Sequence, residues 1–115
     1  MTKQENYFIE MIQRFSKKAY STAFIHGFWE TEHDRNPANK ILLMITELSE
    51  AYEAVRHNNP ADKDCPDFSN LEIELADCIV RILDFTEYNK LNLAAAILAK
   101  MEFNKTRPYK HGKKF

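Results

Sequence analysis

Apolar residues recur at helical spacing along most of the chain. Near the N-terminus Phe8, Ile12, Phe15 and Ala19 follow this spacing. Glycine occurs only twice, and the long periodic stretches lack the β-branched alternation that is typical of strands. The pattern therefore predicts an all-α protein. Its helices are predicted over about residues 4–25, 39–57, 69–88 and 92–105.

The predicted helix ends coincide with capping and breaking residues. A charged loop over about residues 27–37 separates the first two helices, and Asn39 is the predicted N-cap of the second. The Asn-Asn-Pro run at 58–60 ends that helix. Asp67 or Ser69 is the predicted cap of the third helix, and Pro108 prevents the fourth from continuing.

The apolar faces of the two central helices are unusually wide. One side of the second helix carries Ile41, Met44, Ile45, Leu48, Tyr52 and Val55, and one side of the third carries Phe68, Leu71, Leu75, Ile79 and Ile82. Further apolar residues, such as Leu43 and Val80, lie away from these stripes. Helices joined by short loops favour an antiparallel four-helix bundle. Apolar faces this wide suggest burial on more than one side, so a homodimer or homotetramer is expected.

Chain length and the distribution of charge bear on the number of domains and on the ligands that the protein could bind. A chain of 115 residues is expected to form one domain, covering 1–115. The net charge of −1 hides an asymmetry, because residues 47–87 hold eleven acidic and three basic residues, whereas residues 100–115 hold six basic residues and one acid. An acidic middle suits cations, and a basic C-terminal tail, from about residue 106, suits phosphate.

Several function classes are disfavoured. No apolar run approaches the roughly 20 residues that span a bilayer, so no membrane partner is expected. The two cysteines, Cys65 and Cys78, form no CxxC pair, and a cytoplasmic location is expected. No glycine-rich phosphate loop is present, which excludes a P-loop enzyme. The basic residues are confined to one end, so nucleic acid is not an expected partner.

Two pairs of carboxylates stand on the central helices. Glu47 and Glu50 are three residues apart on the second helix, and Glu74 and Asp77 are three apart on the third. Residues at this spacing share a helix face, so four carboxylates would converge if the helices are neighbours. Oxygen ligands favour Mg²⁺, or Mn²⁺ as a substitute, over zinc. Each pair alone is typical of a solvated helix face, and the interest lies in the duplication.

A di-iron carboxylate bundle needs Glu-x-x-His pairs, which neither helix supplies. The pattern instead resembles the signature of the MazG-type all-α nucleotide pyrophosphatase superfamily, which includes dCTP pyrophosphatases and dimeric dUTPases. The likeness lies in Glu47-x-x-Glu50, then 23 residues, then Glu74-x-x-Asp77. The lead-in PANKILLMITELSEA and the ending AKMEFNKTRPYKHGKKF are also similar to that family, so the resemblance covers roughly residues 28–115.

The resemblance implies a role for each motif carboxylate. Glu47, Glu50, Glu74 and Asp77 would hold one or more Mg²⁺ ions that bridge a triphosphate, and Glu47 and Glu50 belong to the catalytic group. Many family members have Glu immediately before the first motif Glu, where this chain has Thr46. The general base is therefore open. Glu53 is the substitute candidate, and a solvated helix glutamate is the competing interpretation.

Phosphate and base contacts are expected outside the motif. Lys100, Asn104 and Arg107 form one helical stripe, and the first two match family positions that contact nucleotide phosphates. The basic tail either folds over the phosphates or is disordered. Trp29 and His33 lie in the region that holds the base in dCTP-directed relatives. Trp29 could stack on a base, or it could plug the end of the bundle.

The expected activity is magnesium-dependent hydrolysis of a nucleoside triphosphate, foremost a deoxynucleotide, to the monophosphate and pyrophosphate. Such an enzyme would serve house-cleaning or control of the nucleotide pool. Two alternatives stay open. One is a non-catalytic helical binding or scaffolding module, and the other is the same fold acting on a nucleoside diphosphate or a specialised nucleotide such as phosphoribosyl-ATP.

Overall fold

The computed structural model describes all 115 residues, of which 71% are helical and none forms a strand. The chain forms five α-helices and a terminal 3₁₀ turn. They are α1 (Lys3–Ile25), α2 (Glu32–Arg35), α3 (Pro37–Arg56), α4 (Asn70–Tyr88), α5 (Leu93–Asn104) and η1 (Tyr109–Gly112). The all-α prediction is confirmed. The four-helix bundle and the oligomer stay predictions.

Capping chemistry explains most helix starts. Thr2 caps α1 and Ser69 caps α4, each in a reciprocal capping box with the residue three positions on. The predicted start of α3 at Asn39 is wrong, because the helix begins at Pro37 with Asn36 as its cap. Proline suits the first helical position, since its missing N–H would have no partner there.

One short helix, α2, was not predicted from the sequence. Residues 27–37 were expected to form a loop, but α2 occupies Glu32–Arg35 within it. The Thr31 side chain accepts from the Asp34 backbone N–H, and the Asp34 carboxylate accepts from the Thr31 N–H. The capping box of Thr31 and Asp34 stabilises a single helical turn, which is too short to show apolar periodicity.

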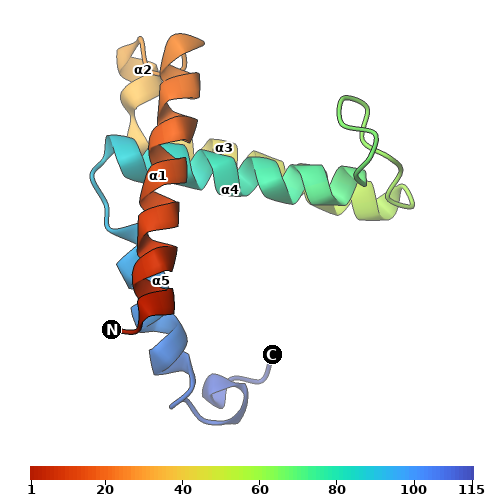
Figure 1. Cartoon of the computed structure of the whole chain (residues 1–115). Helices are drawn as coiled ribbons and strands as arrows, with labels where there is room; N and C mark the ends of the chain where they lie inside the picture. The colour runs from red at the N-terminus through yellow and green to blue at the C-terminus, as the bar shows by residue number, and fades with distance from the viewer.

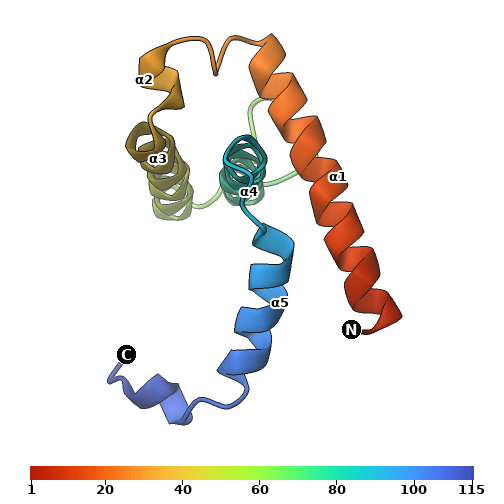
Figure 2. The ribbon, with the colours of Figure 1, turned by 90° about the vertical axis from the view of Figure 1, so that its left-hand side faces the viewer.

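The α3–α4 pair projects sideways from the middle of α1 (Figure 1). Helices α3 and α4 run antiparallel and side by side, α1 crosses α4, and α5 packs against α1. The same arrangement seen along the axes of α3 and α4 shows α5 extending away from that pair (Figure 2). One arm of the molecule is therefore the α3–α4 pair, and the other is built from α1 and α5.

A single chain buries few apolar residues. Its buried apolar residues are Trp29, Ala51, Ala54, Cys78 and Ala94. No large side chain is fully enclosed, and many large apolar residues of α3, α4 and α5 are about half exposed. None of the helices combines the length and the apolar character that crossing a bilayer requires.

Candidate metal centre and the adjoining cavity

Three of the four motif carboxylates converge on the α3–α4 arm. Glu47 and Glu50 lie one turn apart on α3, and Glu74 faces them from the first half of α4. One carboxylate oxygen from each falls within 4.8 Å of the others. Glu47 is buried, Glu74 is half-buried and Glu50 is exposed, so the group opens to solvent on one side. The antiparallel pairing of the two helices creates this proximity.

Two oxygens of the group are buried without a hydrogen-bond partner. The Arg81 Nε–H donates to Glu47 Oε1 at 2.9 Å, and the Asn70 amide donates to Glu74 Oε1 at 3.2 Å. The second oxygen of each carboxylate, Oε2, has no donor. Buried acceptors without partners are costly, and a hard cation would satisfy both. The all-oxygen donor set therefore fits Mg²⁺ or Mn²⁺.

The electrostatics agree with a cation site. Burial raises the pKa of Glu74 to about 7, and the adjacent carboxyls of Glu50 and Glu47 reinforce the rise. Burial also acts to raise the pKa of Glu47, but the Arg81 guanidinium and the neighbouring carboxyls outweigh it, so the pKa is lowered. Without a cation, the group therefore holds a proton near neutral pH, chiefly on Glu74.

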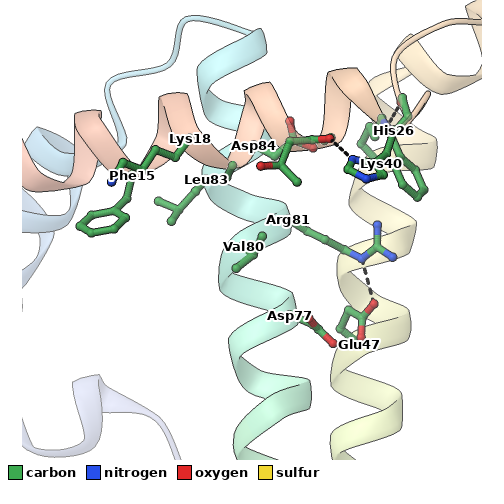
Figure 3. Close-up of a pocket in the computed structure, with 14 residues that line it drawn as sticks. Phe15, Lys18, His26, Lys40, Glu47, Asp77, Val80, Arg81, Leu83 and Asp84 are labelled. Atoms are coloured by element: carbon green, nitrogen blue, oxygen red, sulfur yellow. Dashed lines mark hydrogen bonds and ion pairs between the residues drawn. The ribbon is translucent and has the colours of Figure 1, made fainter. Parts of the chain in front are cut away.

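The fourth motif residue, Asp77, lies outside this group of three. Its carboxylate borders a neighbouring cavity together with Glu47 (Figure 3). Partial desolvation and the negative charge of Glu47 raise the pKa of Asp77. Asp77 is thus placed to face a molecule in the cavity while staying next to the carboxylate group.

The cavity has a volume of about 590 Å³ and lies between α1, α3 and α4. This volume is in the range of small-molecule sites. One end is formed by Glu47, Asp77 and Arg81, and the other by apolar and basic residues of α1 such as Phe15 and Lys18 (Figure 3). The cavity therefore extends from the carboxylates to a region lined by both apolar and basic side chains.

A buried lysine and a buried aspartate line the same cavity. The Lys40 ammonium donates to the Phe28 carbonyl at 2.6 Å, and its pKa is lowered by burial, which the negative charge of Asp84 opposes. Burial raises the pKa of Asp84, which accepts a hydrogen bond from Trp29 Nε1 at 2.8 Å. Sequence reasoning missed Lys40, Arg81 and Asp84. The spacing of Asp77, Arg81 and Asp84, at i, i+4 and i+7 on one face of α4, was an available signal.

Neither of the two expected base-binding residues lines the cavity, although Trp29 contacts Lys40 and Asp84, which do. Trp29 is 4% exposed and stacks on Tyr88 with ring centroids 4.0 Å apart. The Lys40 ammonium lies 4.0 Å from the centroid of the same indole. A base could stack on Trp29 only by displacing one of these partners. His33 is exposed, and its Nδ1 lies 3.0 Å from the Asn39 amide.

The remaining site candidates are not brought to the carboxylates within one chain. Glu53 forms an ion pair with Arg56 at 3.1 Å and lies 3.4 Å from His57 Nε2, outside the group of three. The predicted phosphate-binding residues Lys100 and Asn104 belong to α5, which leads away from the α3–α4 arm in both views (Figures 1 and 2).

The predicted stripe does not extend to Arg107, because α5 ends at Asn104. Both basic residues, Lys100 and Arg107, lie instead against the same aromatic ring. The Lys100 ammonium lies 4.9 Å and the Arg107 guanidinium 5.8 Å from the centroid of Phe103. The Asn104 amide oxygen between them in sequence is buried and has no hydrogen-bond partner. Neither Lys100 nor Arg107, the two basic residues predicted to bind phosphate, forms an ion pair with a carboxylate of the chain.

Comparisons of the chain with protein-family models, with curated proteins and with solved structures found no match. The MazG-like resemblance therefore remains an expectation from the sequence.

Proposed function

We propose that the protein is a magnesium-dependent nucleoside triphosphate pyrophosphohydrolase, which releases the monophosphate and pyrophosphate. The observation that carries the proposal is the convergence of Glu47, Glu50 and Glu74, with one oxygen of each within 4.8 Å of the others. Two of their buried oxygens lack donors. Three carboxylates this close repel one another unless protons or cations lie among them.

Residues of α3 and α4 have defined roles in the proposed reaction. Glu47, Glu50 and Glu74 would hold the cation, which when bound neutralises charge on the phosphate oxygens. The Arg81 guanidinium orients Glu47 through its hydrogen bond at 2.9 Å. Asp77 borders the cavity beside Glu47 and is placed to accept a proton from an attacking water, an alternative to Glu53.

The cavity supports a nucleotide as the substrate class. Its volume of about 590 Å³ accommodates a nucleoside, and it reaches the carboxylates through Glu47 and Asp77. Lys18 and Arg81 add positive charge to its lining, which suits the anionic part of a nucleotide. The preference for a deoxynucleotide comes from the sequence resemblance alone.

The reaction is tested with a panel of the eight common NTPs and dNTPs in the presence of Mg²⁺, with products separated by anion-exchange chromatography. We expect monophosphate and pyrophosphate in equal amounts from at least one of them. Diphosphate with orthophosphate would show cleavage of a different bond. Absence of turnover with every nucleotide would contradict the proposal and favour a non-catalytic helical module.

Two isosteric variants locate the activity. Glu50→Gln removes one charge from the carboxylate group and should lower turnover roughly 100-fold or more. Glu10→Gln is the matched control, because Glu10 is exposed on α1 and pairs only with Arg14 at 3.3 Å. Retained activity in Glu50→Gln, with helical circular dichroism intact in both, would remove the carboxylate group from the mechanism.

A further inference from the structure

A second cavity, of about 370 Å³, lies where α1 meets the end of α4 and the start of α5. Figure 2 shows α5 leaving the end of α4 at this junction. We name it the junction cavity. It shares no lining residue with the cavity beside the carboxylates. Polar side chains line it from two sides, with Gln13, Ser16 and Lys17 on α1 and with Lys90 and Asn92 in the turn between α4 and α5.

Ser16 is a buried polar residue in the wall of the junction cavity. It lies in the middle of α1 and is only 5% exposed. Its hydroxyl forms no hydrogen bond with another group of the chain, whereas the hydroxyl of Thr86, which lines the same cavity, donates to the Leu83 carbonyl at 3.1 Å. A buried hydroxyl without a partner has lost water and gained nothing in return. Ser16 therefore indicates a polar ligand in the cavity.

The N-terminus of α5 opens into the same cavity. Leu93 and Ala94, the first two residues of this 12-residue helix, line it, and neither backbone N–H donates a hydrogen bond within the chain. The next N–H, that of Ala95, reaches the Asn92 side chain only at 3.4 Å. Unpaired N–H groups and the positive end of the helix dipole attract anions. The geometry thus favours a negatively charged ligand over a neutral one.

The charged side chains around the junction cavity support an anion. Two lysines, Lys17 and Lys90, line it, against a single acid, Glu87. The Lys90 ammonium lies 3.7 Å from the Glu87 carboxylate, whereas Lys17 forms no ion pair. The side chains therefore carry a net positive charge, to which the end of α5 adds. Glu87 is the one group that opposes an anion, and it does so by holding Lys90.

We propose that the junction cavity binds the phosphate group of a small molecule. The Ser16 hydroxyl and the N–H groups of Leu93 and Ala94 donate to the phosphate oxygens, and Lys17 and Lys90 neutralise their charge. A volume of about 370 Å³ leaves room for a small organic group beyond the phosphate. None of these residues takes part in the proposed hydrolysis, so binding here does not depend on that activity.

Inorganic phosphate is the probe, and isothermal titration calorimetry on the full chain is the measurement. EDTA in the buffer removes divalent cations, so the carboxylates of α3 and α4 cannot hold phosphate through a metal. We expect saturable binding of one phosphate per chain, with a Kd of about 1 mM or lower. Absence of saturable binding would overturn the proposal, whether or not the protein hydrolyses nucleotides.

Ser16→Ala removes the unpartnered hydroxyl and should weaken phosphate binding roughly 3-fold or more. Lys100→Ala is the matched control, because Lys100 belongs to α5 but does not line the junction cavity and lies against Phe103. This control should bind phosphate as the wild type does. An equal loss in the two variants would place the phosphate elsewhere and overturn the proposal.

Glu87→Gln tests the site in the opposite direction. It removes the carboxylate that holds Lys90, so phosphate should bind roughly 2-fold to 5-fold more tightly. Glu102→Gln is the control, because Glu102 pairs with Lys105 at 3.0 Å outside the junction cavity. Tighter binding cannot result from a damaged fold, so this variant is decisive even if Ser16→Ala fails to fold. Unchanged or weaker binding in Glu87→Gln, or equal tightening in Glu102→Gln, would contradict the assigned site.

Discussion

The Arg81 guanidinium donates to the Glu47 carboxylate at 2.9 Å, linking the middle of α4 to the middle of α3. Glu47 is 7% exposed, so this hydrogen bond is the principal compensation for a buried negative charge. The same contact leaves the other oxygen of Glu47 without a donor. One arginine thus stabilises the carboxylate group while keeping an acceptor free for a cation.

Removal of that arginine should destabilise the fold. Arg81→Ala leaves Glu47 buried without its donor, and we expect a loss of about 1–3 kcal/mol in the free energy of unfolding. Urea denaturation in EDTA measures this loss. Arg14→Ala is the control, since the exposed pair with Glu10 should contribute less than about 0.5 kcal/mol. Equal effects in the two variants would contradict the role given to Arg81.

The stability of the cation-free protein should fall as pH rises through neutrality. The pKa of Glu74 is about 7 in the folded chain against an ordinary value of 4.5. At a pH between these two pKa values, the Glu74 carboxyl holds a proton in the folded state that it has released in the unfolded state. The free energy of unfolding therefore decreases with rising pH. Thermal melts in EDTA from about pH 5 to 8 measure the slope.

Glu74→Gln provides the control for that slope, because its amide does not titrate. We expect its melting temperature to vary less than that of the wild type over the same pH range. When Mg²⁺ replaces EDTA, it should oppose the decrease in the wild-type protein. An identical slope in the two proteins would show that Glu74 does not hold the proton.

Divalent cations should stabilise the folded protein without any nucleotide. The proposed cation site exists only in the folded chain, where the carboxylates converge, so binding of Mg²⁺ or Mn²⁺ there should raise the melting temperature with cation concentration. Glu50→Gln should lose most of this rise. Glu53→Gln should keep it, because Glu53 lies with Arg56 and His57 outside the group.

The same Glu53 variant tests the proton-acceptor prediction separately. Slower turnover with unchanged cation-induced stabilisation would support Glu53 as the general base. An unchanged rate would leave Asp77 as the remaining candidate for the general base. A loss of cation stabilisation in Glu53→Gln equal to that in Glu50→Gln would contradict the assigned group of three.

Trp29 should act on stability rather than on base recognition. Trp29→Phe keeps an aromatic ring against Tyr88 but removes the donor to the buried Asp84, with an expected loss of about 1–3 kcal/mol. Tyr7→Phe is the control, because Tyr7 is 62% exposed on α1. Unchanged stability together with a raised KM for the substrate would support base stacking instead.

Helix positions were predictable because they depend on neighbouring residues. Apolar periodicity located α1 and α4 to within a residue or two, and the Ser69 cap was among the two predicted. Asn36 was missed in favour of Asn39 because both are good caps, and proline at the first helical position decides between them. The single turn α2 is too short for a periodic pattern.

The candidate site was predictable only in part. The spacing placed Glu47 with Glu50 and Glu74 with Asp77 on shared helix faces, as local geometry requires. The rotation of α3 and α4 about their axes then brings Glu74 to Glu47 and Glu50, whereas Asp77 borders the cavity. Spacing along one helix carries no information on that rotation, which depends on side-chain packing between helices.

The four long helices, the Ser69 cap and the two carboxylate pairs could be read from the sequence, because each depends on contacts within about one helical turn. The pairing of Arg81 with Glu47 and the enclosure of Trp29 between Tyr88 and Lys40 depend on how the helices pack. The same packing keeps Lys100 and Asn104 of α5 away from the carboxylates of their own chain. These contacts join residues distant in sequence, and the packing of whole helices is what brings such residues together or keeps them apart.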